Sequence, residues 1–229
     1  MLTTTKNKTD LELKTDVLAE LTYEPTVKVT DVGVQVKEGV VTLTGHVSSY
    51  SEKWHAIESA KRVAGVRAIA DEIRIHLPDS MRHTDGDIAG EAATHIAWST
   101  SLPKGAVKVS VREGCITLTG ELEWWYQKRA AEHAVQHLHG VKEVTNLITI
   151  KPTHPHGNIE AAITSAFERN AVLEARKIQV QSEESRVTLR GTVKSYAERD
   201  EAERTAWAAP GVYSVDNQIQ VEWFWGLTD

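Results

Sequence analysis

The residues in this chain with the most capacity for chemistry are closely spaced histidines. His133 and His137 are four residues apart and His139 follows, and two histidines separated by one helical turn can face the same zinc ion. In an earlier, similar segment of the chain, however, the first two positions are Glu58 and Arg62. Residues of that kind are typical of a solvated helix face, so the sequence favours a solvent-facing pair over a zinc site.

Other reactive side chains lack the partners that catalysis or metal binding would need. His154 and His156 fall in a segment that we expect to be a surface loop, and Cys115 is the single cysteine, so it can form no internal disulfide. The sequence contains no phosphate-binding glycine loop, paired-cysteine motif or calcium loop. The serines that could act as nucleophiles occupy positions that a repeat explains. The sequence therefore predicts no catalytic residue, no resident metal and no enzyme activity.

A short stretch of sequence occurs three times. Residues 115–120 (CITLTG) match residues 40–45 and 186–191, and a Gly-Val pair follows 20 residues after the last glycine of each stretch. A period near 70 residues suits small tandem domains rather than solenoid units. The glycines of the repeated pattern are Gly45, Gly65, Gly120, Gly140, Gly191 and Gly211.

The same order of elements is expected in each repeat. Leu13, Val17 and Leu21 lie on one face of a first helix, and alternating apolar residues on both sides of a turn at 37–39 predict a β-hairpin. A second helix begins after Ser49, a good N-cap residue, and ends at Gly65, before a last strand. We predict an α+β fold of three small α-β-β-α-β sandwiches, each a three-stranded mixed sheet with two helices on one face. The predicted ranges are a disordered tail at 1–8 and repeats at 9–77, 85–151 and 157–225.

The strand end Val-Thr-Leu-Thr-Gly and a terminal Gly-Val-x-x-Val-x-Asn motif complete the pattern. Repeat 2 carries the motif with Asn146 and repeat 3 with Asn217, whereas repeat 1 has Asp71. Together with the order of elements, these residues resemble the BON domain, named for bacterial OsmY and nodulation proteins. The resemblance implies a bacterial protein of osmotic or envelope stress, with no catalytic residues, from a class that associates with phospholipid surfaces. Some relatives in the cytoplasm suggest a weakly held potassium ion.

Charge and hydropathy limit the partners and the compartment. The net charge is -6, and residues 81–152 carry eight basic and eight acidic side chains. No repeat is basic, which argues against nucleic acid as a partner. The N-terminal residues lack the apolar core of a signal peptide, and no stretch is apolar enough for a transmembrane segment. We therefore expect a cytoplasmic protein, or a periplasmic one if a leader has been trimmed from this chain.

Several tryptophans occupy positions that are mostly polar in the other repeats. Packing between repeats is the favoured interpretation; self-association into a homo-oligomer and a lipid or protein surface are the alternatives. Repeat 2 carries no net charge, so if one repeat meets an anionic membrane, we expect it to be repeat 2. The functional hypotheses are thus phospholipid or protein-surface binding, potassium sensing, and a self-assembling scaffold. The candidate surface residues are Trp54, Trp98, Trp124, Trp125 and Trp207, and Trp223 and Trp225 are expected to cap repeat 3.

Overall fold

The computed structural model describes residues 8–77, 83–152 and 157–222, and it confirms the predicted fold class. Each repeat runs helix, strand, strand, helix, strand. Repeat 1 contains α1 (Asp10–Tyr23), β1 (Val32–Lys37), β2 (Val40–Val47), α2 (Tyr50–Arg62) and β3 (Ala68–Ile75). Repeat 2 contains α3 (Asp85–Trp98), β4 (Val107–Arg112), β5 (Cys115–Leu122), α4 (Trp125–Val135), β6 (Glu143–Asn146) and β7 (Thr149–Ile150). Repeat 3 contains α5 (Ile159–Arg169), β8 (Ile178–Glu183), β9 (Arg186–Val193), α6 (Tyr196–Trp207) and β10 (Ser214–Val221).

Each sheet has its second strand in the middle. In repeat 1 the order is β1-β2-β3, with β1 antiparallel and β3 parallel to β2. Repeat 3 has the same arrangement. In repeat 2 the third strand is broken into β6 and β7, which both pair with β5. Leu147 lies at the break and is 58% exposed, whereas Ile148 is buried.

The three repeats have separate hydrophobic cores. The apolar stripe of the first helix is buried in each of them, as its four-residue spacing predicts, and it packs against the inner face of the sheet. These buried residues are Leu13, Val17, Leu21, Ile88, Ala92, Ile96, Ile159, Ile163 and Phe167.

The glycine that ends each repeated stretch is required by a close approach of two strands. Gly120 has φ +147°, and a Cβ at this position would lie 2.1 Å from the carbonyl oxygen of Ala106. The same clash would occur at Gly45 with the Asp31 carbonyl and at Gly191 with the Lys177 carbonyl, each of which directly precedes the first strand of its repeat. Only glycine fits there, because any side chain would displace the backbone of the hairpin.

The Asn or Asp position of the last motif joins the third strand to the second helix. In repeat 2 the side-chain amide of Asn146 donates to the Lys128 carbonyl (2.9 Å) and to the Glu132 carboxylate (3.1 Å), and its oxygen accepts from Ile148 N–H (3.3 Å). Asn217 makes the equivalent bonds in repeat 3. The amide thus supplies two donors and one acceptor to a half-buried site.

Repeat 1 uses an ion pair at the same place. The Asp71 carboxylate cannot donate; it accepts from Ile73 N–H and lies 2.7 Å from Lys53 Nζ. Lys53 also donates to the Ile73 carbonyl (3.0 Å). The position equivalent to Glu132 is Ile57, so Asp71 meets no second carboxylate from that position. In repeat 1, Lys53 and Ile57 of α2 therefore compensate for the presence of Asp71 at the motif's asparagine position.

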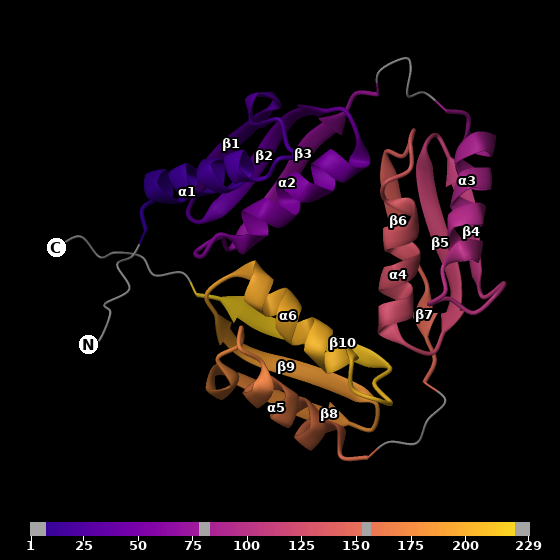
Figure 1. Cartoon of the computed structure of the whole chain (residues 1–229). Coiled ribbons are helices and arrows are strands. Elements are labelled where there is room, and N and C mark those ends of the chain that lie inside the picture. Colours follow the sequence, from indigo (N-terminus) through magenta and orange to yellow (C-terminus); the bar gives the residue numbers. More distant parts are fainter. Residues whose placement is uncertain (1–7, 78–82, 153–156, 223–229) are drawn as a thin grey trace.

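The repeats are arranged around a common centre (Figure 1), with α2, α4 and α6 on the inner side. Repeat 3 returns to contact repeat 1, so that the first and last repeats lie side by side. The chain thus forms a ring of three units joined head to tail. Its three contacts are named joint 1–2, joint 2–3 and joint 3–1 after the repeats that meet there.

Candidate functional site

An aromatic residue begins the second helix of every repeat and enters the neighbouring repeat. Tyr50, Trp125 and Tyr196 occupy the same position. Tyr50 packs against the core of repeat 2, and Tyr196 packs against the core of repeat 1. Trp125 stacks on Trp207 of repeat 3. Each joint therefore brings the start of one helix to the end of another.

Joint 3–1 is closed by direct polar contacts in addition to Tyr196. The Gly65 N–H donates to the Lys194 carbonyl (3.1 Å). Lys61 Nζ lies 3.4 Å from the Asp200 carboxylate. Burial lowers the pKa of Lys61, but hydrogen bonds and charge from Glu58 and Asp200 outweigh it and raise the pKa overall. The charged form of Lys61 is therefore favoured at joint 3–1, where it contacts Asp200 of repeat 3.

Joint 1–2 combines a phenol with a hydrogen-bonded histidine. Burial raises the pKa of Tyr50, with a further contribution from the charge of Glu132. Next to it, Ser51 Oγ lies 2.8 Å from His137 Nδ1. Tyr50 and Ser51 therefore place the start of α2 against the end of α4.

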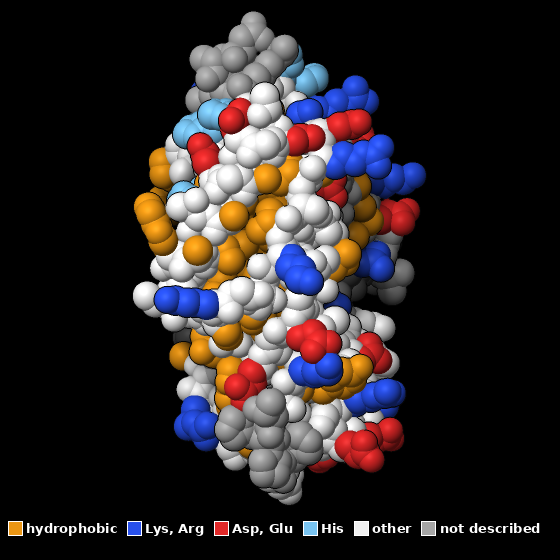
Figure 2. All heavy atoms as spheres, turned by 90° about the vertical axis from the view of Figure 1, so that its right-hand side faces the viewer, with side chains coloured by type: hydrophobic (Ala, Val, Ile, Leu, Met, Phe, Trp, Pro, Cys, Tyr) orange, Lys and Arg blue, Asp and Glu red, His pale blue; other side chains and the backbone are white. Residues whose placement is uncertain are grey.

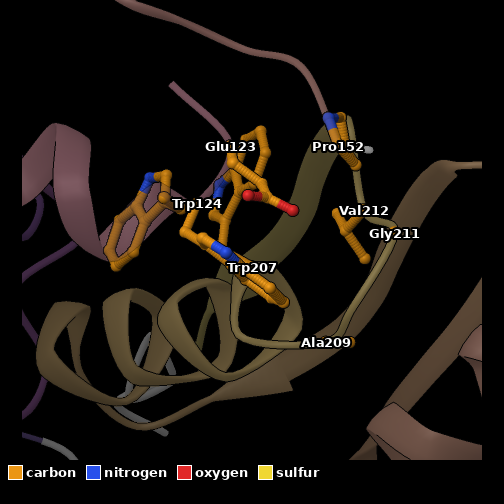
Figure 3. A pocket seen from close by; sticks show the side chains of 8 residues that line it. Glu123, Trp124, Pro152, Trp207, Ala209, Gly211 and Val212 are labelled. Carbon is orange, nitrogen blue, oxygen red and sulfur yellow. The ribbon is translucent and has the colours of Figure 1, made fainter. Parts of the chain in front are cut away.

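Joint 2–3 differs because two indoles meet there. The rings of Trp125 and Trp207 are stacked, with centroids 6.3 Å apart and planes inclined by 5°. The Arg129 guanidinium lies 5.3 Å from the centre of the Trp125 ring, a cation–π arrangement. Figure 3 shows Trp124, Trp207 and the Glu123 carboxylate around the adjoining pocket, with Val212 and Pro152 beyond.

Beside the stacked indoles, an open groove of about 670 Å³ runs between the start of α4 and the end of α6. Its lining is mostly apolar and aromatic, with two guanidinium groups. Arg204 is held by both carboxylate oxygens of Glu201 (2.6 and 2.7 Å), whereas within the described ranges Arg129 has no carboxylate in ion-pair contact. We name this site the aromatic groove, and its lining residues are Trp124, Trp125, Tyr126, Arg129, Arg204, Trp207 and Ala208.

The predicted surface tryptophans separate into three environments. Trp124, Trp125 and Trp207 meet at the aromatic groove. Trp54 is half-buried with its ring edge-on to His55 at 5.0 Å. Trp98 ends α3 and is 78% exposed. The remaining pair, Trp223 and Trp225, lies outside the described residues.

Trp124 stands where the other repeats have an N-cap serine. Ser49 and Ser195 accept the N–H of the third helical residue with their hydroxyl groups. In repeat 2 the bond runs the other way, because the Gln127 side chain accepts the Trp124 N–H (3.1 Å). This substitution lets the α4 helix start with consecutive aromatic residues.

Sequence comparison missed Tyr50, Tyr196, Tyr126 and Arg129. A signal for the first two was present, because the aromatic at the first helical position is common to all three repeats. Tyr126, which is 56% exposed, and Arg129 occupy positions where the residue type varies between repeats. Only the packing at joint 2–3 shows that they share a surface.

The histidines lie at joint 1–2 and not in a metal cluster. The ring centroids of His133 and His137 are 5.2 Å apart. Across the part of the chain that the structure describes, no group of three or more His, Cys, Asp or Glu side chains is arranged to hold a metal ion. His154 and His156 lie outside the described residues. Lys8, assigned by sequence to the tail, binds Asp16 (2.7 Å) and the Ala64 carbonyl (3.2 Å).

The strand-end glycines of the motif therefore permit the hairpins, and the motif asparagines join the third strand to the second helix. The aromatic groove, in contrast, is an open surface site. None of the helices in the described ranges is long and apolar enough to cross a membrane.

Among known proteins, one from Escherichia coli is similar in sequence to this chain. Osmotically-inducible protein Y of Escherichia coli (strain K12) is 30% identical over 148 residues, which are 62% of this chain and 73% of that protein. Among solved structures, CdsD, a structural protein of the type III secretion system of Chlamydia trachomatis, matches with 15% identity, 93% of each chain and a TM-score of 0.26. The C-terminal domain of CdsD matches 93% of this chain and 98% of its own, again at 15% identity, with a TM-score of 0.25.

The family comparison covers almost the whole ring. The BON domain matches residues 9–76, 84–152 and 156–222, which correspond to the three units with separate cores. The chain belongs to the BON domain family, with three copies of the domain.

Proposed function

We propose that this protein is a non-catalytic binding module of osmotic stress that associates with anionic phospholipid surfaces through the aromatic groove. The observation that carries the proposal is the convergence of three indoles, a phenol and the Arg129 guanidinium on one open site. The likeness to an osmotically inducible protein supports the stress association.

The chemistry of the groove suits a lipid–water boundary. Indole and phenol rings present an apolar body with a polar edge, and such groups are enriched where acyl chains meet headgroups. A guanidinium binds phosphate oxygens through several N–H donors. Arg129 is exposed and lies beside these rings, so it could bind a phosphate while the rings contact the acyl region.

The surrounding surface of repeat 2 favours the same partner. Trp98 and Tyr126 are exposed, and α3 packs against α4. Figure 2 shows the outer face of this repeat, on which hydrophobic side chains gather along the middle and charged side chains lie mainly along one edge. Residues 81–152 carry no net charge, so the approach to an anionic bilayer is opposed less here than in the other repeats. The same contacts would serve a cytoplasmic or a periplasmic protein, because both compartments border a bilayer.

Co-sedimentation with vesicles tests the proposal. The full chain is mixed with vesicles of phosphatidylglycerol and phosphatidylcholine, or of phosphatidylcholine alone, and the bound fraction is measured. We expect binding to the anionic vesicles and a loss of about tenfold or more in Trp124→Ala, since burying a large aromatic side chain contributes about 1.5–3 kcal/mol. Arg129→Gln should weaken binding to anionic vesicles and reduce its dependence on salt.

Matched variants separate the groove from general surface effects. Tyr23→Ala removes an aromatic that is 84% exposed at the position in repeat 1 equivalent to Trp98. Arg112→Gln makes the same charge change as Arg129→Gln on an exposed strand position of repeat 2. Both controls should bind like wild type. Unchanged vesicle binding in Trp98→Ala and Trp124→Ala would refute the proposal, and absence of any vesicle binding would leave the groove to a protein partner.

A further inference from the structure

Three histidines from two repeats meet at joint 1–2. His133 comes from α4, His137 from the turn that directly follows α4, and His55 from α2 of repeat 1. The His137 ring centroid lies 5.2 Å from that of His133 and 6.3 Å from that of His55. Nothing in the aromatic groove involves these residues, and they form no metal cluster within the described ranges.

The hydrogen bonds of His137 require a neutral ring with one particular tautomer. The buried Gln136 amide nitrogen lies 2.9 Å from His137 Nε2. An amide nitrogen can only donate, so Nε2 must accept and carries no proton. The proton of the neutral ring is then on Nδ1, which donates to Ser51 Oγ at 2.8 Å. A second proton on Nε2 would face the Gln136 donor and break that bond.

The charges around His137 also oppose its protonation. Burial lowers the pKa of His137, and the nearby His133 and His55 lower it further. On α4, the Glu132 carboxylate accepts a hydrogen bond from Asn146. At the end of α1, the Glu24 carboxylate faces His55, but it accepts a hydrogen bond from Thr26 and lies 3.7 Å from Arg62. These carboxylates are engaged within their own repeats, and the ring nitrogens of His137 contact Ser51 and Gln136 instead.

We propose that joint 1–2 is a proton-sensitive contact, in which protonation of His137 separates repeat 1 from repeat 2 while joint 2–3 stays closed. The closed joint favours neutral His137, because the pKa of that residue is lowered there. Closure is therefore fully supported above the ordinary histidine pKa of about 6.5 and is weakened as the pH falls through that value towards the lowered one.

Hydrogen exchange of the full chain tests this inference. Amide exchange is followed by mass spectrometry at about pH 7.5 and about pH 5.5, on either side of the ordinary histidine pKa, and corrected for the intrinsic pH dependence of exchange. We expect protection of the α2 start (residues 50–57) and of the α4 end with the turn after it (133–138) to fall at acid pH. The loss at about pH 5.5 should be several-fold and at most about tenfold, because that pH lies about one unit below the ordinary histidine pKa of about 6.5. Peptides of the α6 end, at joint 2–3, should keep their protection.

Two single substitutions make the test specific. His137→Gln keeps a polar side chain but cannot be protonated, so most of the acid-induced loss should disappear. His95→Gln removes an exposed histidine on α3, away from the joint, and should respond to acid like wild type. Equal protection at both pH values in wild type, or an undiminished acid response in His137→Gln, would overturn the inference. A response abolished equally by His95→Gln would overturn it as well.

Discussion

The link between Asn146 and Glu132 allows a test in which a damaging substitution is rescued by a second one. In Asn146→Asp the two amide donors to the Lys128 carbonyl and the Glu132 carboxylate are lost. The new carboxylate would face both acceptors. A neutral hydrogen bond contributes about 0.5–1.5 kcal/mol and one to a charged group about 1.5–3 kcal/mol. Because the site is half-buried and Lys128 can reorient, we expect a loss of about 2–3 kcal/mol in the free energy of unfolding.

Repeat 1 shows which second substitution should restore stability. It combines Asp71 with Lys53 and has Ile57 where repeat 2 has Glu132. Asn146→Asp combined with Glu132→Ile recreates this set, since Lys128 already stands at the position of Lys53. The like-charge contact disappears and a Lys–Asp pair replaces it, so most of the lost stability should return.

Urea denaturation of the four proteins in this cycle, followed by tryptophan fluorescence at neutral pH, measures the effect. Glu132→Ile alone is the control, because it leaves the Asn146 amide without its carboxylate acceptor and should lower stability. If Asn146→Asp unfolds within about 0.5 kcal/mol of wild type, or if the double variant is no more stable than Asn146→Asp, the coupling is wrong; measured non-additivity of about 1 kcal/mol or more would support it.

Further predictions concern the hairpin, joint 3–1 and acid stability. Gly120→Ala should lower the free energy of unfolding by at least about 1–3 kcal/mol, measured by urea denaturation, because its Cβ would lie 2.1 Å from the Ala106 carbonyl oxygen. Lys61→Asp should loosen joint 3–1 and Asp200→Lys added to it should restore the contact; double-mutant denaturation should give a coupling of about 0.5–1 kcal/mol. Burial opposes the charge of Glu52, but N–H and hydroxyl donors around its carboxylate outweigh this and lower its pKa. The stability contributed by this carboxylate is present above the ordinary pKa of about 4.3 and is lost as the pH falls through the lowered pKa. Glu52→Gln should therefore lower the free energy of unfolding at neutral pH and reduce its dependence on pH in acid.

The fold could be predicted because each repeat is determined by local patterns. The four-residue spacing of Leu13, Val17 and Leu21 specifies a buried helix face without reference to other repeats, and the strand-end glycines are fixed by contacts within one hairpin. The break in the last strand of repeat 2 was not predicted. Leu147 and Ile148 are adjacent apolar residues, and a regular strand can bury only one of them; the structure buries Ile148.

The joints could be predicted only in part, because they depend on residues about one or two repeats apart. Trp54 and Trp207 were selected because they differ from the residues at the same positions in the other repeats. The joints instead depend on a feature that all three repeats share, the aromatic residue at the start of the second helix. Trp125 and Trp207 are 82 residues apart in sequence and meet only when repeats 2 and 3 pack together. No periodicity within a repeat carries that information.

The contact between the first and last repeats changes what each joint must supply. Once joints 1–2 and 2–3 have formed, repeat 3 is held beside repeat 1 at a high effective concentration, so joint 3–1 closes without a further loss of translational freedom. A contact as small as Tyr196, one ion pair and one backbone hydrogen bond can then persist. Conversely, a repeat that leaves one joint is still held by the other and by its linkers, and it re-forms the contact as an intramolecular step. The ring can therefore open at one place and remain assembled at the other two.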